Sequence, residues 1–315
     1  LFFFEHAKAM LQRETLINAI IIAWNVVSSL ACIFLNKIVF TKLEWPHGAA
    51  LTTIHFYMTF LGLGICALLG VFEVKRLPIS GVFGLSTSFA VFIVTMNLSL
   101  RHNSVGFYQV SKVVDTPFVY LIQALFYGVH YCTEVKVSLV LVMAGVLVVT
   151  TSENMYTNWL GLFFAVTGVT ACSFYQVWAG TKQKEFNVNA MQLLLYKVPI
   201  SALLLTLTLP LTEDLKAIRE FTYSWQLIGM ILLSSVAGFC VNLSVFVMIG
   251  RTSPMVYNVL GHAKFVGILI GGFVLFGDPL STKVLTGMAV TCCGLWMFSY
   301  FKMFPPNPKK EQEEV

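Results

Sequence analysis

Residues 105–126 read VGFYQVSKVVDTPFVYLIQALF, and this stretch decides what kind of fold the chain can adopt. It is long enough to cross a bilayer, because a membrane-spanning helix needs about 20 mostly apolar residues. Its first half nevertheless contains a lysine, an aspartate and a proline, at Lys112, Asp115 and Pro117. Charged residues inside a membrane helix are costly and usually functional. The stretch therefore predicts a membrane helix that contributes to a polar site.

The whole chain has the composition of an integral membrane protein. Of its 315 residues, 57% are hydrophobic and only 11% are charged. Soluble domains carry about 25% charged residues. The alternation of apolar and polar residues that is typical of barrel strands is absent. We therefore predict an all-α helical bundle embedded in the lipid bilayer. Most Lys and Arg residues lie in loops, where they are solvated, and we expect no nucleic-acid partner.

Apolar runs between turn-forming breaks predict ten transmembrane helices. They lie near residues 15–40, 48–71, 79–100, 104–127, 133–152, 159–180, 188–210, 225–249, 254–276 and 282–302. The prediction leaves residues 1–14 and 303–315 as tails of a single transporter domain, 1–315.

The distribution of Lys and Arg between the loops predicts the orientation of the chain. Eleven lie on the side of the two termini: Lys8, Arg13, Lys75, Arg76, Lys136, Lys182, Lys184, Arg251, Lys302, Lys309 and Lys310. Five lie on the other side: Lys42, Arg101, Lys216, Arg219 and Lys283. Because cytoplasmic loops are the more basic ones, we predict that both termini are cytosolic.

The two halves of the chain resemble each other. Five residues recur 140 positions later, near the end of the sixth span and directly after it: Ala31, Cys32, Phe34, Thr41 and Lys42. Ser104 and Tyr108 recur 149 positions later as Ser253 and Tyr257, and the segment at Asn97 is repeated at Asn242 as Asn-Leu-Ser. With five spans in each half, 15–152 and 153–302, the second half enters the membrane inverted. Inverted repeats are typical of secondary transporters with a site near the midplane.

Four lysines fall within the predicted spans: Lys37, Lys112, Lys197 and Lys264. Only one acid, Asp115, lies well inside a span. Lys37 is near a span end and can snorkel to the interface. For Lys197, snorkelling and a binding role remain equally open. The excess positive charge suggests a bound anion.

Lys112 and Asp115 are three residues apart and share a helix face, so either an ion pair or a ligand role is open for Lys112. Pro117 lacks an N–H and frees the carbonyl of Val113, another possible partner. The repeat predicts that Lys264 lies across from Lys112 in one cavity.

A phosphate or diphosphate suits such a basic cavity. The tyrosines Tyr108 and Tyr257 can stack on a base, bond a sugar hydroxyl, or simply pack. His262 and Asn258 accompany Lys264 in the ninth span, where His262 either orients a ligand or packs. We expect these residues to form the site with Lys112 and Lys197, supported by Asp115, Pro117, Asn97 and Asn242.

The chain resembles the triose-phosphate translocator and nucleotide-sugar transporter branch of the drug/metabolite transporter superfamily, with solute carrier family 35, subfamily E, as the nearest match. The segments that carry the resemblance are FLNK (34–37), SVGFYQVSKVVDTP (104–117), FYQVWAGTKQKE (174–185), MQLLLYKVP (191–199) and 242–281. The resemblance implies ten spans, alternating access, strict exchange of organic phosphates and a Golgi or endoplasmic reticulum membrane.

In this family the span-nine lysine after Gly-x binds phosphate, which maps to Lys264, and the span-four lysine maps to Lys112. Phe265 stands where plastid phosphate translocators have arginine, and Tyr196-Lys197-Val198 stands where GDP-mannose carriers have paired asparagines. A UDP-sugar is left by elimination, and the exchange that the resemblance implies makes a nucleotide monophosphate the expected counter-substrate. A sugar-phosphate translocator and a non-transporting regulator remain alternatives.

The sequence does not favour an enzyme. Phe276-Gly277-Asp278 lacks the first glycine of the intramembrane aspartyl protease motif, and no zinc-protease or serine-nucleophile motif is present. The seven cysteines lack zinc spacing and mostly lie in apolar runs. We expect no cofactor and no metal.

Overall fold

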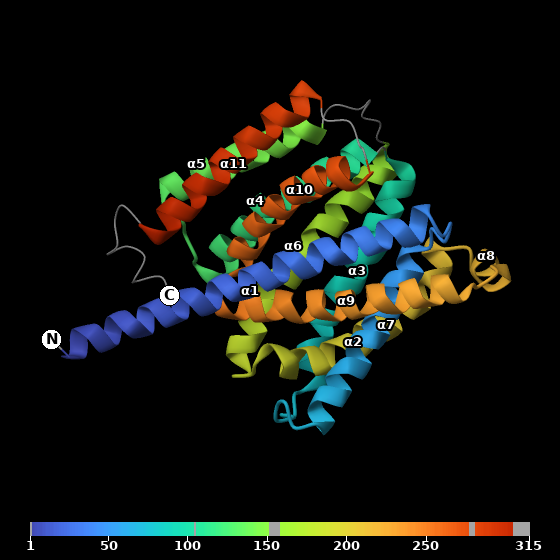
Figure 1. The fold of residues 1–315 in the computed structure, drawn as a ribbon, viewed down its shortest axis with the longest axis horizontal. Helices are drawn as coiled ribbons and strands as arrows, with labels where there is room; N and C mark the ends of the chain where they lie inside the picture. The colour runs from blue at the N-terminus through green and yellow to red at the C-terminus, as the bar shows by residue number, and fades with distance from the viewer. Residues whose placement is uncertain (1, 104, 151–157, 277–280, 305–315) are drawn as a thin grey trace. The chain divides into compact units, whose positions relative to one another are not determined.

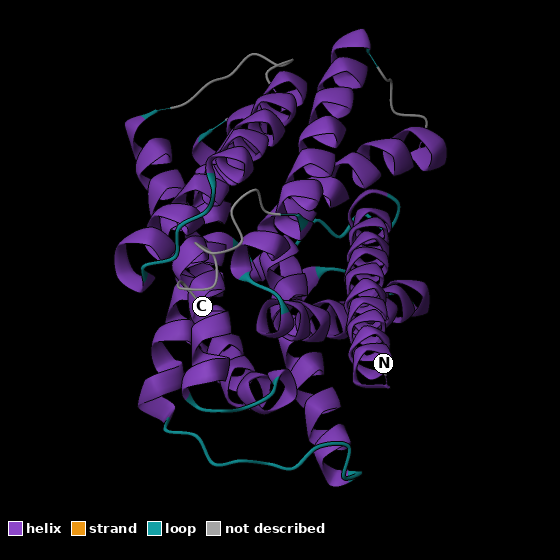
Figure 2. Cartoon of the chain, turned by 90° about the vertical axis from the view of Figure 1, so that its left-hand side faces the viewer, coloured by secondary structure: helices purple, strands orange, loops and turns teal. Residues whose placement is uncertain are grey.

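A computed structural model describes residues 2–103, 105–150, 158–276 and 281–304, and within them the only regular elements are helices (Figures 1 and 2). In chain order they are α1 (Phe2–Thr41), α2 (Gly48–Leu68), α3 (Ile79–His102), α4 (Val105–Tyr127), α5 (Thr133–Thr150), α6 (Trp159–Glu185), α7 (Ala190–Thr212), α8 (Leu215–Glu220), α9 (Trp225–Arg251), α10 (Pro254–Phe276) and α11 (Thr282–Met303).

The prediction of an all-helical membrane protein is confirmed. Within the described residues, seven segments are long and apolar enough to cross a membrane: Glu14–Thr41, Gly48–Leu68, Ile79–Ser99, Trp159–Glu185, Ala190–Thr212, Trp225–Arg251 and Thr282–Phe301. They expose many large apolar side chains; Leu68 of α2, for example, is 89% exposed. Trp159 and Trp225 stand exposed at helix starts, as interfacial tryptophans do.

Two helix boundaries differ from the sequence prediction by five residues or more, and one additional helix is present. The helix α1 begins at Phe2, so the expected tail at residues 2–14 continues the first helix. The helix α6 runs to Glu185, because Gln183 donates to the Ala179 and Phe246 carbonyl oxygens at 2.8 and 2.9 Å. The short helix α8, capped by Asp214, was not predicted. The expected tail beyond residue 304 lies outside the described residues.

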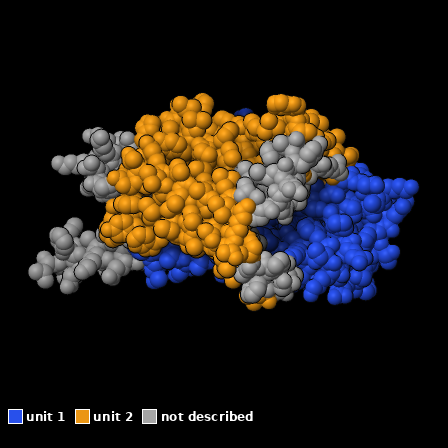
Figure 3. Space-filling model, turned by 90° about the horizontal axis from the view of Figure 1, so that it is seen from above, with its two compact units in different colours: residues 1–82, 179–206, 213–253 blue, residues 83–178, 207–212, 254–315 orange. Residues whose placement is uncertain are grey.

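The chain forms two compact units, and each unit takes helices from both halves of the sequence (Figure 3). Unit 1 comprises residues 1–82, 179–206 and 213–253, and therefore holds α1, α2, α8, α9 and most of α7. Unit 2 comprises residues 83–178, 207–212 and 254–315, with most of α3 and α6 and all of α4, α5, α10 and α11.

Glycines allow α5 and α11 to pack closely within unit 2, where the two helices lie side by side (Figure 1). A Cβ atom on Gly145 would lie 2.5 Å from the backbone nitrogen of Thr291 and 2.8 Å from the carbonyl oxygen of Gly287. One on Gly294 would lie 2.8 Å from the backbone nitrogen of Val142. Small residues hold membrane helices together in this way, because van der Waals contact replaces the hydrophobic effect in lipid.

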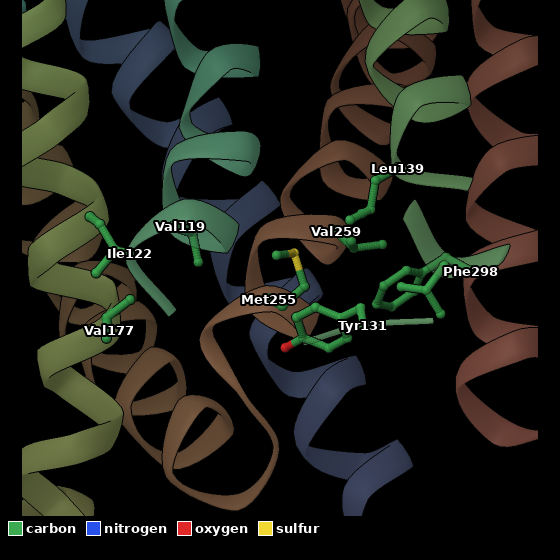
Figure 4. Close-up of a cluster of buried hydrophobic side chains, with 9 residues drawn as sticks. Val119, Ile122, Tyr131, Leu139, Val177, Met255, Val259 and Phe298 are labelled. Atoms are coloured by element: carbon green, nitrogen blue, oxygen red, sulfur yellow. The ribbon is translucent and has the colours of Figure 1, made fainter. Parts of the chain in front are cut away.

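An apolar core joins α4, α5, α6, α10 and α11 in unit 2 (Figure 4). Its members come from distant parts of the sequence and are almost fully buried: Val119, Ile122, Tyr131, Val135, Leu139, Val177, Met255, Val259 and Phe298. This core fixes the rotation of α4 and α10, which carry most of the predicted site residues.

Hydrogen bonds between polar side chains connect the apolar helices of unit 1. Asn25 of α1 donates to the hydroxyl of Ser244 in α9 at 2.9 Å. The hydroxyl of Ser234 in α9 donates to Asn36 of α1 at 2.5 Å and lies 2.8 Å from Nε2 of His55 in α2. Polar side chains inside a membrane are retained where they bond across helices.

Two groups of contacts, here called clasps, connect the ends of α2 and α7 in unit 1. In the first clasp, the ammonium of Lys75 donates to the carbonyl oxygens of Phe186 and Asn187, both at 3.0 Å. The Gln192 side-chain amide donates to the Glu73 carbonyl oxygen at 2.7 Å. The first clasp thus joins the segment after α2 to the segment before α7 and the first turn of that helix.

The second clasp is built around the carboxylate of Glu213, just after α7. It accepts a hydrogen bond from the backbone N–H of Ala49, in the first turn of α2, at 2.8 Å. Its other oxygen lies 3.0 Å from Nδ1 of His47. A carboxylate at a helix N-terminus is stabilised by the free N–H groups there. The two clasps therefore fasten α2 and α7 to each other in antiparallel directions.

Candidate functional site

The helix α4 continues through Pro117 without a break. Proline removes one backbone donor, but the helix is held in place by the apolar core around Val119 and Ile122. Asp115 and Thr116, directly before the proline, are 7% and 1% exposed. The proline therefore lies in the same turn as two buried polar side chains that face other helices.

The carboxylate of Asp115 is held by side chains of α6. The Ser173 hydroxyl donates to Oδ1 at 2.6 Å, and the Gln176 amide donates to Oδ2 at 2.5 Å. The thiol of Cys172 lies 3.8 Å from Oδ2. A buried carboxylate is tolerated when such donors replace water. Sequence spacing had suggested Lys112 as the partner of Asp115; that ion pair stays a prediction, and Lys112 itself is exposed in unit 2.

A second contact connects α4 directly to α10. The hydroxyl of Thr116 lies 2.8 Å from Nε2 of His262, and both side chains are buried. Which atom donates depends on the tautomer of the imidazole. The predicted role of His262, either orienting a ligand or packing, remains open, but the histidine is now seen to position the two helices on which Lys112 and Lys264 lie.

Lys264 is buried in α10, with 9% of its surface exposed, and its ammonium lies 4.9 Å from the ring centroid of Tyr257. A cation over an aromatic face is stabilised by the ring quadrupole. Tyr257 also lies close to Asp115 and Cys172. The structure thus brings Lys264, Tyr257 and Asp115 into one region of unit 2, together with Asn258, which lies beside the Asp115 carboxyl.

The internal repeat does not align Lys264 with Lys112 directly; the two positions differ by three residues, about one helical turn. The 149-residue offset that matches Tyr108 to Tyr257 pairs Lys264 with Asp115 instead, and it pairs Lys112 with Gly261. Equivalent positions of the two halves therefore carry a base and an acid. The side chain of Tyr108 lies outside the described residues, although α4 includes its backbone.

Lys197 lies apart from this cluster in sequence and belongs to unit 1. Its side chain is 0% exposed, and its ammonium lies 4.3 Å from the ring centroid of Phe56 and 5.9 Å from that of Phe246. Aromatic faces partly replace the hydration of a buried cation. The charged group is enclosed by protein, so snorkelling does not describe it.

The two asparagines of the repeated Asn-Leu-Ser segments have different surroundings. Asn242 in α9 donates to the hydroxyl of Thr59 in α2 at 3.1 Å. Asn97 in α3 is half-buried. Of the two asparagines, Asn242 is therefore the one with a described role in connecting helices.

Sequence reasoning missed three side chains of the cluster: Thr116, Ser173 and Gln176. Ser173 and Gln176 are three residues apart in the apolar helix α6 and so share one face. That pattern was a usable signal, because paired polar residues on one face of a membrane helix point to a buried partner.

Buried cations and a hydrogen-bonded carboxylate within a bundle of apolar helices are features of a membrane transporter of anionic solutes. The chain belongs to the Triose-phosphate Transporter family, whose model matches residues 15–299. This membership places it among transporters rather than enzymes.

Curated relatives cover most of the chain. It is 32% identical over 280 residues to UDP-xylose transporter 3 of Arabidopsis thaliana, an alignment of 88% of this chain and 78% of that protein. It is 34% identical over 284 residues to UDP-rhamnose/UDP-galactose transporter 1 of the same plant, covering 88% and 81% of the two chains.

A solved structure titled "Crystal structure of protein" has the same fold, with a TM-score of 0.75. It is 11% identical and the match covers 92% of this chain and 99% of that one. At this identity the likeness concerns the fold alone.

Proposed function

We propose that the chain is a secondary-active antiporter that exchanges a UDP-sugar for a nucleotide monophosphate by alternating access around a central basic site. The carrying observation is the burial of Lys264 on Tyr257 inside α10, in a chain that aligns along 88% of its length with UDP-sugar transporters. A fixed cation inside a membrane helix suits an anionic substrate. A Golgi or endoplasmic reticulum membrane, where nucleotide sugars are consumed, is the proposed location.

The proposed architecture is ten transmembrane helices in two inverted repeats, 15–152 and 153–302. Helix contacts in the two units support it. The two halves are offset by 140 residues between α1 and α6, and by 145 residues between the Asn-Leu-Ser segments of α3 and α9. With these offsets, the residues equivalent to Asn25 of α1 and Ser244 of α9, which are hydrogen-bonded, are residue 165 of α6 and residue 99 of α3. If residues 165 and 99 face each other in antiparallel helices, the pairs one turn away in either direction should face each other as well. Two close approaches between α6 and α3 agree with this pairing: Gly161 with Asn103, and Gly168 with Met96.

The connections before α2 and α7 give independent support for the repeat. Among the described non-glycine residues, positive φ angles occur at Glu44 and Asn187, at 52° and 49°. Each of them lies three or four residues before a helix, α2 or α7. A positive φ angle is uncommon outside glycine. Its occurrence at equivalent positions before α2 and before α7 is therefore what two repeats of one structure would produce.

The charge distribution predicts that both termini are cytosolic. An epitope tag after Val315 should be accessible to antibody when only the plasma membrane is permeabilised. A tag in the connection between α7 and α9, at Ala217, should require permeabilisation of the organelle membrane as well. The reverse pattern would overturn the orientation.

Transport should require a substrate on both sides of the membrane. A cavity lined by fixed positive charge reorients poorly when empty, because the charge then lacks its counter-ion in a medium of low dielectric constant. In proteoliposomes, uptake of labelled UDP-xylose should be fast after preloading with UMP and close to background in empty vesicles. Equal uptake into both would show that the protein is not an obligatory exchanger.

The same assay separates the proposed function from its alternatives. Phe265 follows Lys264 at the place where plastid phosphate translocators have arginine, which disfavours a three-carbon phosphate substrate. A panel of UDP-sugars, other nucleotide sugars and sugar phosphates should show exchange with UDP-sugars first. Exchange of sugar phosphates alone would make the protein a phosphate translocator, and no exchange of any substrate would favour a regulator.

A further inference from the structure

Two buried amide atoms in unit 2 lack hydrogen-bond partners among the described residues: Oε1 of Gln176 and Nδ2 of Asn258. Both residues belong to the group around Asp115, and their side chains are only 4% and 9% exposed. Most buried polar groups in proteins are hydrogen-bonded, and leaving one unpaired is costly. Two such atoms beside one carboxylate indicate a place that a ligand completes.

Chemistry fixes the orientation of the Gln176 amide. A carboxylate only accepts hydrogen bonds, so the NH₂ group of Gln176 must face Asp115, as the 2.5 Å contact has it. The carbonyl oxygen Oε1 is then left as an acceptor. The cluster therefore presents the acceptor oxygens of Asp115 and Gln176 together with one free donor on Asn258.

Tyr257 connects this cluster with the cation that the proposed function assigns to phosphate. Asn258 follows Tyr257 in α10, the ammonium of Lys264 lies 4.9 Å from the centroid of the Tyr257 ring, and Tyr257 interacts electrostatically with Asp115. A nucleotide sugar bound by Lys264 through a phosphate would extend along Tyr257 toward the amides.

We propose that Asp115, Gln176 and Asn258 form a subsite for neighbouring hydroxyl groups of a sugar ring in the nucleotide-sugar substrate, an inference that rests on the proposed function. Each sugar hydroxyl both donates and accepts, so two neighbouring hydroxyls can donate to the Gln176 and Asp115 oxygens and accept from Asn258. The pairing edge of uracil fits less well, because it has one donor, N3–H, for the two acceptor groups of Asp115 and Gln176.

The hydroxyls can come from the transferred sugar or from the ribose of the nucleotide. Three probes distinguish these sources: UDP-xylose has both rings, UMP has only the ribose hydroxyls, and 2′,3′-dideoxy-UMP has neither pair. Binding of each probe is measured on purified full-length protein, together with its melting temperature.

The principal variant is Asn258→Leu, which removes the donor with little change in volume. Because Nδ2 lies beside the Asp115 carboxyl but makes no close hydrogen bond, the melting temperature should change little. Binding of UDP-xylose should weaken roughly tenfold, the effect of about one lost hydrogen bond. Gln176→Met tests the acceptor in the same way.

The matched control is Gln123→Met. Gln123 is also a buried glutamine with a partnerless Oε1, but it lies eight residues beyond Asp115 along α4, about 12 Å at the rise of a helix. This control should leave the binding of all three probes unchanged.

The pattern over the probes decides the outcome. A loss with UDP-xylose but not UMP supports the transferred sugar, and a loss with UDP-xylose and UMP but not the dideoxy nucleotide supports the ribose. Unchanged UDP-xylose binding in Asn258→Leu, or an equal loss with all three probes, overturns the subsite. Failure of the parent protein to bind any of them would instead overturn the proposed function.

Discussion

Lys264→Ala should abolish exchange while the protein remains folded. The ammonium contacts the uncharged ring of Tyr257, so truncation leaves no charged group behind at this contact. Charged hydrogen bonds to phosphate contribute about 1.5–3 kcal/mol, so binding of UDP-xylose should weaken roughly ten- to a hundredfold. Binding, exchange in proteoliposomes and melting temperature are measured on the same preparation.

Two further variants make the Lys264 result specific. Lys264→Arg retains the charge but alters its geometry, and should keep only part of the activity. Lys216→Ala removes a positive charge from an exposed position in α8, where the ion pair to Glu220 is 4.0 Å long, and should exchange normally. Parent-like binding and exchange in Lys264→Ala would mean that this lysine is not the anion site.

Gly145→Ala should destabilise the protein strongly although it adds one methyl group. The new Cβ would meet backbone atoms of Thr291 and Gly287 at 2.5 and 2.8 Å, so α5 and α11 must move apart. Overpacking of this kind costs about 1–3 kcal/mol. Thermal unfolding in detergent should show a clearly lower melting temperature, and expression should fall.

Gly229→Ala provides the matched control in α9. A Cβ on Gly229 meets nothing within 4 Å, so only the intrinsic preference for alanine in helices remains, about 1 kcal/mol in its favour. Its melting temperature should equal or exceed that of the parent. Equal destabilisation in the two variants would show that close packing of α5 and α11 is not the cause.

The long helices were predictable because the bilayer sets their length. The apolar run 282–302 coincides with α11 to within a residue, and the run 79–100 with α3 to within two. Apolar content does not predict the ends of helices made of polar residues, because such helices need no lipid around them. The short helix α8 and the last turn of α6 are examples.

The polar side chains buried in α4, α6 and α10 were partly predictable. Lys264, Asn258 and His262 could be selected because polar residues are rare within apolar spans. The pairing of Asp115 with its partners could not be predicted, because sequence spacing identifies neighbours on one helix only. Ser173 and Gln176 are 58 and 61 residues away from Asp115 and lie on another helix. Such pairs depend on how α4 and α6 are rotated, and the packing of the whole unit sets that rotation.

The two clasps restrict the movements open to α2 and α7. Sliding one helix past the other by a single turn, 5.4 Å, would break the Glu213 contacts at one end and the Lys75 and Gln192 contacts at the other at the same time. Tilting one helix alone would break at least one of them. During transport α2 and α7 are therefore expected to move as one rigid element, with bending confined to segments that neither clasp holds.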